Sequence, residues 1–330
     1  MKKNRLFPQV VFLCFILGFL FLLPLQSFSQ DFPSGPITLY VGYAPGAATD
    51  ITARVLGKEA EGFLGVPVVV ENKPGGASAV AASLVASKKP DGYTLAVVSS
   101  AALTGTHIMT RNLAYDPMKD FTYLFSYSDY MIALCVRTES PFKTLPELIE
   151  HARKNPEALS YSSSGTGNSA HLFAEHLSRQ ANVKFKHVPF KGGAPAYTAL
   201  LGGHVDFTIG SGSHVPYVKQ GLWRMLVIAH QEKRDPKFPD VPTWKEYGYK
   251  PLPGGASSLV VLAPKNLPDS VYRKLESGFT QAAHTPKFRK LLESRDMPFV
   301  FKNRRQWETE LPKDYKSSEE FLRELGLAAK

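Results

Sequence analysis

The chain has 330 residues, of which 44% are hydrophobic and 21% charged, and a formal net charge of +10. Its length suffices for two hydrophobic cores, and the lack of a second long apolar run favours a soluble globular protein. The cations are dispersed, without a basic stripe interleaved with aromatic residues, so we expect no nucleic acid partner.

The first segment has the pattern of a secretory signal peptide. Lys2, Lys3 and Arg5 precede an apolar run over residues 6–25, which ends before the small-residue site Ser27-Phe28-Ser29. We predict that residues 1–29 are a leader cleaved after Ser29, so that the mature chain begins in the periplasm with a net charge of +7. A membrane anchor is the alternative, but Pro24 interrupts the run.

The two cysteines predict neither a lipid anchor nor a disulfide. Cys14 lies in the middle of the apolar run, whereas a lipid-modified cysteine would stand at its end. Removal of the leader leaves Cys135 alone, so an intramolecular disulfide is impossible although the compartment permits one.

Short β-branched runs alternate with helical stretches along the chain. We expect strands over residues 37–41, 66–71, 94–98, 131–136, 160–163, 186–188, 205–209, 225–228 and 257–262. We expect helices over residues 50–62, 77–87, 144–155, 169–180 and 194–201. Strand followed by helix, repeated, predicts an α/β fold with mostly parallel sheets flanked by helices.

Two long apolar strands, at residues 131–136 and 257–262, are interpreted as crossings between domains. This interpretation makes the first domain discontinuous, with residues 36–134 and 256–330. Residues 135–255 form the second, inserted domain.

Candidate ligand-binding residues lie in the loops that follow strands, because ligands of open parallel sheets bind beyond the carboxyl ends of the strands. Loops rich in Gly, Ser, Thr and Asn at residues 43–50, 72–78 and 162–169 can bring backbone amides and hydroxyls against an anion. Any one of these loops is equally explained by caps and turns. The candidates are Tyr43, Pro45, Gly46, Ala47, Ala48, Thr49, Asp50, Ser99, Ser163, Ser164, Gly165, Thr166, Gly167, Asn168, Lys191 and Gly192.

Two of these candidates have a second interpretation. Asp50 is favoured as an N-cap of the following helix, and the alternative is a contact with an ammonium group of the ligand. Lys191 either pairs with a ligand carboxylate or is solvated.

Three patterns that suggest other chemistry are incomplete. Gly165-Thr166-Gly167-Asn168-Ser169-Ala170 fits a dinucleotide fingerprint, but Lys184 and His187 stand where its acidic residue is needed, so no cofactor is expected. His171, Glu175 and His176 lack a zincin spacing and are interpreted as solvated helix surface, so no metal site is expected. Residues 210–214 place serine near histidine without a nucleophile elbow or an orienting acid, and we expect no enzyme.

An ordered set of motifs resembles the solute-binding receptors of tripartite tricarboxylate transporters, the Bug family. The motifs are residues 43–50 with Arg54, 71–75, 90–95, 163–167 with His171-Leu172, 187–192, 201–206 and 240–243. The resemblance implies a two-domain periplasmic-binding-protein fold of type II that closes on a small organic anion. Its ligand loops match Tyr43–Thr49 and Ser163–Asn168.

The family's ligands include di- and tricarboxylates, acidic amino acids, nicotinate-like rings and aromatic acids, so the resemblance gives the class and not the identity. This chain carries Ala47 and Ala48 where glycine is usual, and Asn168 where serine is common. Residues 77–79 and 254–258 also depart from the family pattern.

The resemblance implies a binding protein that delivers a carboxylate to the integral-membrane permease subunits of a transporter. A secreted hydrolase that uses a Ser-rich loop is one alternative. A receptor that reports ligand occupancy to a sensor is another.

Overall fold

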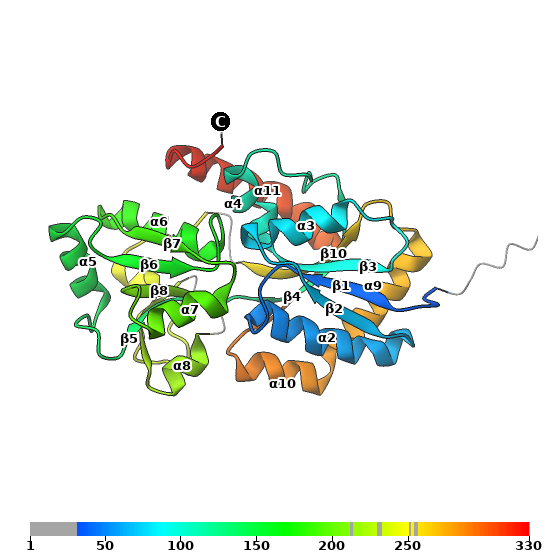
Figure 1. Cartoon of the computed structure of the whole chain (residues 1–330), viewed down its shortest axis with the longest axis horizontal. Coiled ribbons are helices and arrows are strands. Elements are labelled where there is room, and N and C mark those ends of the chain that lie inside the picture. The colour runs from blue at the N-terminus through cyan, green and yellow to red at the C-terminus, as the bar shows by residue number, and fades with distance from the viewer. Residues whose placement is uncertain (1–31, 212–213, 230–232, 251, 254–256, 330) are drawn as a thin grey trace, which may run out of the picture.

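The computed structural model describes residues 32–211, 214–229, 233–250, 252–253 and 257–329. Two mixed sheets, each flanked by helices, form two halves that lie side by side (Figure 1). The expected leader and its cleavage site fall outside the described residues. In the part of the chain that is described, no helix combines the length and apolar character needed to span a membrane.

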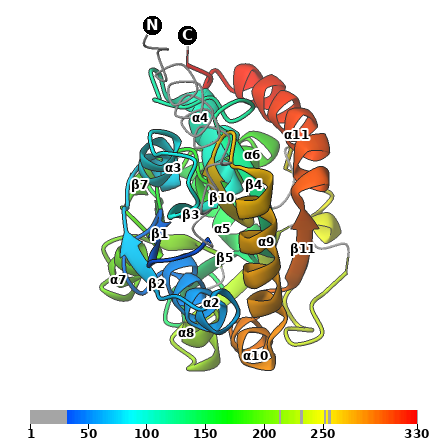
Figure 2. The same ribbon diagram turned by 90° about the vertical axis from the view of Figure 1, so that its right-hand side faces the viewer.

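The first half contains a six-stranded sheet. In spatial order its strands are β11 (Phe299–Asn303), β4 (Phe121–Asp129), β10 (Ser258–Pro264), β3 (Thr94–Ser99), β1 (Ile37–Val41) and β2 (Val68–Asn72). Its helices are α2 (Ala48–Leu64), α3 (Ala79–Ala86), α4 (Gly105–Met109), α9 (Asp269–His284), α10 (Pro286–Ser294) and α11 (Arg304–Glu324), with short 3-10 turns η1 (Gly76–Ser78) and η2 (Ser100–Leu103). Helix α11 and strand β11 lie on the side of this half opposite to α2 and β2 (Figure 2).

The second half contains a five-stranded sheet. Its strands, in spatial order, are β7 (Lys186–Pro189), β6 (Ser160–Ser163), β8 (Phe207–Ser211), β5 (Ile132–Arg137) and β9 (Trp223–Ile228). Its helices are α5 (Leu145–Lys154), α6 (Ser169–Ala181), α7 (Gly193–Leu201) and α8 (Val215–Lys219), with the 3-10 turn η3 (Trp244–Tyr247).

The pairing of the strands is parallel only where a strand leads into a polar loop. Strand β1 pairs in parallel with β2 and β3, and β6 with β7 and β8. Strands β10 and β5 run antiparallel to both of their neighbours. The expected mostly parallel pairing therefore describes part of each sheet, because alternation of strand and helix does not reveal the direction of a strand that enters from the other half.

Burial explains why these segments form strands. In β1, Ile37, Leu39 and Val41 are buried and the residues between them are half-buried. This alternation is typical of a strand with one face more deeply buried than the other. Every residue of β10 is buried, which matches its continuous apolar sequence and its central position.

The chain crosses between the halves at Tyr130 and Met131, since β4 ends at Asp129 and β5 begins at Ile132. The expected boundary between residues 134 and 135 thus falls inside β5. The C-terminal helix α11 also reaches the second half (Figure 1). The ring of Phe321 in α11 lies nearly perpendicular to the His176 ring of α6, with centroids 5.0 Å apart.

Candidate functional site

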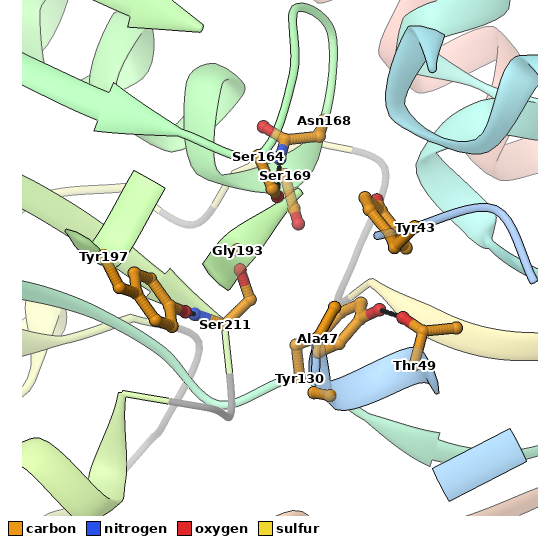
Figure 3. A pocket seen from close by; sticks show the side chains of 11 residues that line it. Tyr43, Ala47, Thr49, Tyr130, Ser164, Asn168, Ser169, Gly193, Tyr197 and Ser211 are labelled. Atoms are coloured by element: carbon orange, nitrogen blue, oxygen red, sulfur yellow. Dashed lines mark hydrogen bonds between the residues drawn. The ribbon is translucent and has the colours of Figure 1, made fainter. Parts of the chain in front are cut away.

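A pocket lies between the two halves, with lining residues from both of them (Figure 3). The empty space between its walls is about 320 Å³, part of which is open to solvent. Its lining residues are Tyr43, Ala47, Ala48, Thr49, Tyr130, Ser164, Asn168, Ser169, Gly193, Tyr197 and Ser211. None of these residues carries a formal charge.

The loop from β1 to α2 forms the wall of the first half. Tyr43 and Ala47 lie in this loop, and Ala48 and Thr49 are the first residues of α2. No side chain caps the N-terminus of α2, because Ala47 occupies the N-cap position. Backbone N–H groups of the first helical turn are therefore available to an acceptor in the pocket.

Asp50 is not the N-cap, contrary to the favoured interpretation of the sequence, because α2 begins two residues before it. Its buried carboxylate accepts hydrogen bonds from the backbone N–H of Gly46 at 2.9 Å, from Arg54 Nε at 2.9 Å and from Asn72 Nδ2 at 2.8 Å. These hydrogen bonds stabilise the β1–α2 loop, although Asp50 itself does not line the pocket.

The loop from β6 to α6 forms the opposite wall. Asn168 is the N-cap of α6, and its Oδ1 accepts from the backbone N–H of His171 at 2.9 Å. Its Nδ2 donates to Ser164 Oγ, which orders a second pocket residue. Ser169 then opens the helix, so the N-terminus of α6 also faces the pocket.

The second half also lines the pocket with the N-terminus of a third helix, α7, and with a tyrosine of that helix. Helix α7 begins at Gly193, and Tyr197 lies one turn further along it. The Tyr197 hydroxyl accepts from the backbone N–H of Ser211 at 2.9 Å, and burial raises the pKa of Tyr197. The hydroxyl stays protonated and retains its hydrogen for an acceptor in the pocket.

Two further tyrosines belong to the first half and the crossing segment. The Tyr130 hydroxyl is hydrogen-bonded to Thr49 Oγ1, so the crossing segment is joined to α2. Burial raises the pKa of Tyr43, while hydrogen bonding with the Ser78 and Ser99 hydroxyls partly offsets this rise. Ser99 therefore contacts Tyr43, which lines the pocket, but does not line the pocket itself.

Six of the residues singled out in the sequence line the pocket together: Tyr43, Ala47, Ala48, Thr49, Ser164 and Asn168. The others lie in the same loops or beside them but outside the lining: Pro45, Gly46, Asp50, Ser99, Ser163, Gly165, Thr166, Gly167, Lys191 and Gly192. Lys191 is exposed.

Five lining residues were missed. Ser169 is the last residue of the expected loop 162–169 but was not among the candidates, and Gly193 directly follows the candidate Gly192. Tyr130, Tyr197 and Ser211 come from three distant segments, and nothing local in the sequence marks them.

Glycines of the second half lie against the backbone of the first half. A Cβ placed on Gly167 would lie 2.7 Å from Thr106 Cα, and one on Gly165 would lie 3.1 Å from the Ala77 backbone nitrogen. A Cβ on Gly192 would approach the Ala44 backbone nitrogen to 3.2 Å. The glycines therefore permit the halves to approach closely, rather than making room for an anion.

The histidines of α6 are buried, so their interpretation as solvated helix surface was wrong. The His171 ring stacks on His187 with centroids 4.2 Å apart, and its Nδ1 accepts from the Gly167 N–H at 3.1 Å. Burial lowers the pKa of His171 to about 3 and that of His187 to about 4. Neutral imidazoles thus support the β6–α6 loop, and no cluster with metal-ligand composition occurs among the described residues.

The pocket is suited to an anion although none of the described residues that line it has a charged side chain. Three helix N-termini, at Ala48, Ser169 and Gly193, meet at one cavity. Each contributes a partial positive charge and unpaired N–H groups. Serine, threonine and tyrosine hydroxyls add donors around them.

Comparisons with known proteins agree with this architecture. The family model described as tripartite tricarboxylate transporter family receptor matches residues 52–327. A UPF0065 protein encoded in the gbd 5' region of Cupriavidus necator is 38% identical over 93% of this chain and 92% of its own length.

Two solved structures share the fold over most of both chains. The periplasmic binding protein BugD is 27% identical, with a TM-score of 0.85 over 91% of this chain and all of its own. MatC from Rhodopseudomonas palustris with bound malate is 29% identical, with a TM-score of 0.80 over 88% of this chain and 99% of its own.

Proposed function

Because the chain belongs to the tripartite tricarboxylate transporter family of receptors, we propose that it binds a small organic carboxylate between its halves. We propose further that it delivers this ligand to the integral-membrane permease subunits of a transporter. The observation that carries the proposal is the convergence of three helix N-termini on one uncharged pocket.

The physical chemistry of the pocket favours a carboxylate over other small solutes. A carboxylate has only acceptor oxygens, and the pocket offers N–H groups at helix N-termini and hydroxyl donors. A cationic solute lacks a carboxylate partner among the lining residues. Malate in MatC is a ligand of this chemical class.

The proposal includes closure of two domains on the ligand. One domain would contain the strands from 37–129 and 258–303, and the other the strands from 132–228. The boundary then falls near Tyr130, a few residues before the position expected from sequence. The close approach of Gly165, Gly167 and Gly192 to the other half supports a closed arrangement.

We propose that the mature chain is periplasmic, with residues 1–29 removed on export. The relative BugD is a periplasmic binding protein, and the sequence of residues 1–29 has the pattern of a secretory leader. N-terminal sequencing of exported protein should find Gln30 as the first residue. A chain that still carried residues 6–25 would contradict this location.

A secreted hydrolase is the second candidate, favoured by one observation. Ser163 Oγ lies 2.7 Å from His187 Nε2, the distance of a nucleophile and its base. However, Ser163 is buried and also bonds the Gly165 carbonyl, and within the described chain no carboxylate is hydrogen-bonded to the His187 ring. The pair is therefore explained as a brace of the β6–α6 loop.

Titration calorimetry distinguishes these candidates. The chain is titrated with malate, tricarboxylates, acidic amino acids, aromatic acids and the esters of these acids, and each compound is recovered and analysed afterwards. A binding protein should saturate at one acid per chain and return it unchanged. Turnover of any acid or its ester would support the hydrolase, and lack of binding to every carboxylate would contradict the proposal.

A further inference from the structure

A buried carboxylate connects the two halves away from the pocket. Asp296 lies in the turn between α10 and β11 of the first half, and its side chain is 1% exposed. Its backbone has a φ of 51°, in the left-handed region. Aspartate and asparagine adopt this conformation more often than most other non-glycine residues.

Two lysines of the second half meet this carboxylate. Lys219, at the end of α8, places Nζ 2.9 Å from Asp296 Oδ2. Lys237, in the segment between β9 and η3, places Nζ 2.6 Å from Asp296 Oδ1. Burial raises the pKa of Asp296, but the two ammonium groups outweigh it and the net pKa lies below its usual value, so the carboxylate is ionised at neutral pH.

Packing at the start of α8 anchors this short helix. His214, just before α8, is buried, and a Cβ on Gly210 would lie 2.3 Å from the His214 ring. The ring thus occupies the space that this glycine leaves open. Helix α8 is only five residues long, so Lys219 lies close to this anchored end.

The ion pairs lie beside the crossing segment. Met131, the last residue before β5, lines the same surface groove as Lys237 and Asp296. Asp296 belongs to the first half and both lysines belong to the second, so separation of the halves would part the carboxylate from both ammonium groups. A carboxylate buried without its partners is strongly disfavoured, so separation of the halves requires Asp296 to become hydrated.

We propose that Asp296, Lys219 and Lys237 form an interdomain latch that stabilises the closed arrangement without touching the ligand. The latch rests on the proposed function only in that closure accompanies ligand binding. It would set how readily the empty protein closes and how slowly it opens.

Single-molecule fluorescence energy transfer tests the latch without any ligand. Fluorophores are attached to the mature chain through Lys89→Cys and Lys184→Cys, which are exposed positions of different halves. Cys135 is fully buried and burial raises the pKa of its thiol, so it does not compete for the dye.

Wild type should show a closed population, and Asp296→Asn should lower the ratio of closed to open molecules by about tenfold. Asparagine tolerates the left-handed backbone, so this variant keeps the turn. The double variant Lys219→Gln/Lys237→Gln should reproduce the shift, and the conservative variant Lys219→Arg should keep the wild-type ratio.

The matched control is Glu59→Gln, which removes a 2.9 Å ion pair with Lys287 between two helices of the first half. It should leave the closed-to-open ratio unchanged. The latch is overturned if wild type has no closed population, if Asp296→Asn and the lysine double variant keep the wild-type ratio, or if Glu59→Gln shifts it equally. No ligand is added, so failure to find a carboxylate ligand would contradict the proposed function without changing this result.

Discussion

Asp50 shows how one side chain supports the pocket without lining it. Its two oxygens accept from the Gly46 N–H, Arg54 and Asn72. Asp50→Asn replaces one of these accepting oxygens by an NH2 group, which is itself a donor. At least one of the N–H groups that now bind Asp50 is then left without an acceptor in a buried place. We expect a loss of about 1–3 kcal/mol in the free energy of unfolding, measured by urea denaturation.

Glu150→Gln provides the comparison for Asp50, since it removes an ion pair with Lys154 whose members are both largely exposed. That change should leave the unfolding free energy nearly unchanged, because an exposed ion pair contributes little to stability. Equal stabilities for the two variants would show that the Asp50 carboxylate does not brace the loop.

The buried histidine His171 predicts a pH dependence of stability. Burial lowers its pKa to about 3 in the folded chain, whereas an unfolded histidine has a pKa of about 6.5. Between these values the unfolded state binds the proton and the folded state does not, so stability falls as pH falls from about 6.5 toward 3. The slope from this group is at most about 1.4 kcal/mol per pH unit.

Urea denaturation of wild type and His171→Asn from pH 4 to pH 7 measures this dependence. The Asn oxygen can replace Nδ1 as acceptor of the Gly167 N–H, so the variant should fold. Its stability should fall less steeply below pH 6 than that of wild type. Parallel curves would mean that the His171 pKa is not depressed in the folded chain.

At the scale of elements, Asn168 both caps the N-terminus of α6 and lines the pocket. Asp is as good an N-cap as Asn, so Asn168→Asp should preserve α6. It also places a negative charge at the anion site. We expect the affinity for a carboxylate to fall by tenfold or more, on the order of the 1.4 kcal/mol that a factor of ten represents, with little change in thermal stability.

Asn303 offers the matched control, because its Oδ1 caps α11 by accepting from the Gln306 N–H at 3.0 Å. Asn303→Asp makes the same chemical change outside the pocket and should leave affinity unchanged in titration calorimetry. If Asn168→Asp also binds like wild type, the anion site is elsewhere.

The elements next to the site were predictable where local sequence carries the signal. Strands β1 and β6 have the expected bounds, since β-branched or small polar runs end at polar loops there. Strand β4, with the sequence FTYLFSYSD, shows no clean alternation because nearly all of it is buried, and it was not predicted. Helices α9 to α11 were also missed.

The site itself was predictable only in part, for a physical reason. Glycine, serine and asparagine gather in loops at strand ends, which marks two walls of the pocket. Tyr130 and Tyr197 are buried aromatic residues, and a sequence gives no distinction between a ring that fills a core and one that lines a cavity. Their role follows from the meeting of the halves.

At the scale of the whole molecule, contact between the halves should govern affinity. A Cβ on Gly167 would overlap the Thr106 backbone, so Gly167→Ala should hinder closure and weaken ligand binding although Gly167 is outside the pocket lining. Calorimetry measures the affinity, and small-angle scattering should find less compaction on adding ligand.

Gly221 separates this steric effect from backbone strain. Its φ of 73° is close to the 78° of Gly167, but nothing lies within 4 Å of a Cβ placed there. Gly221→Ala should therefore cost similar stability with no loss of affinity. Equal losses of affinity in the two variants would rule out contact between the halves as the cause.

Native mass spectrometry of the exported protein, purified without added ligand, tests the central claim most directly. Gentle ionisation followed by collisional release should yield one small organic acid per chain. When the purified acid is bound again and released, its mass should be unchanged. The fraction of chains that carry the acid should be lower in Asn168→Asp than in Asn303→Asp. Release of a cationic or uncharged solute, or equal retention of the acid by the two variants, would contradict an anion held by helix N-termini in this pocket.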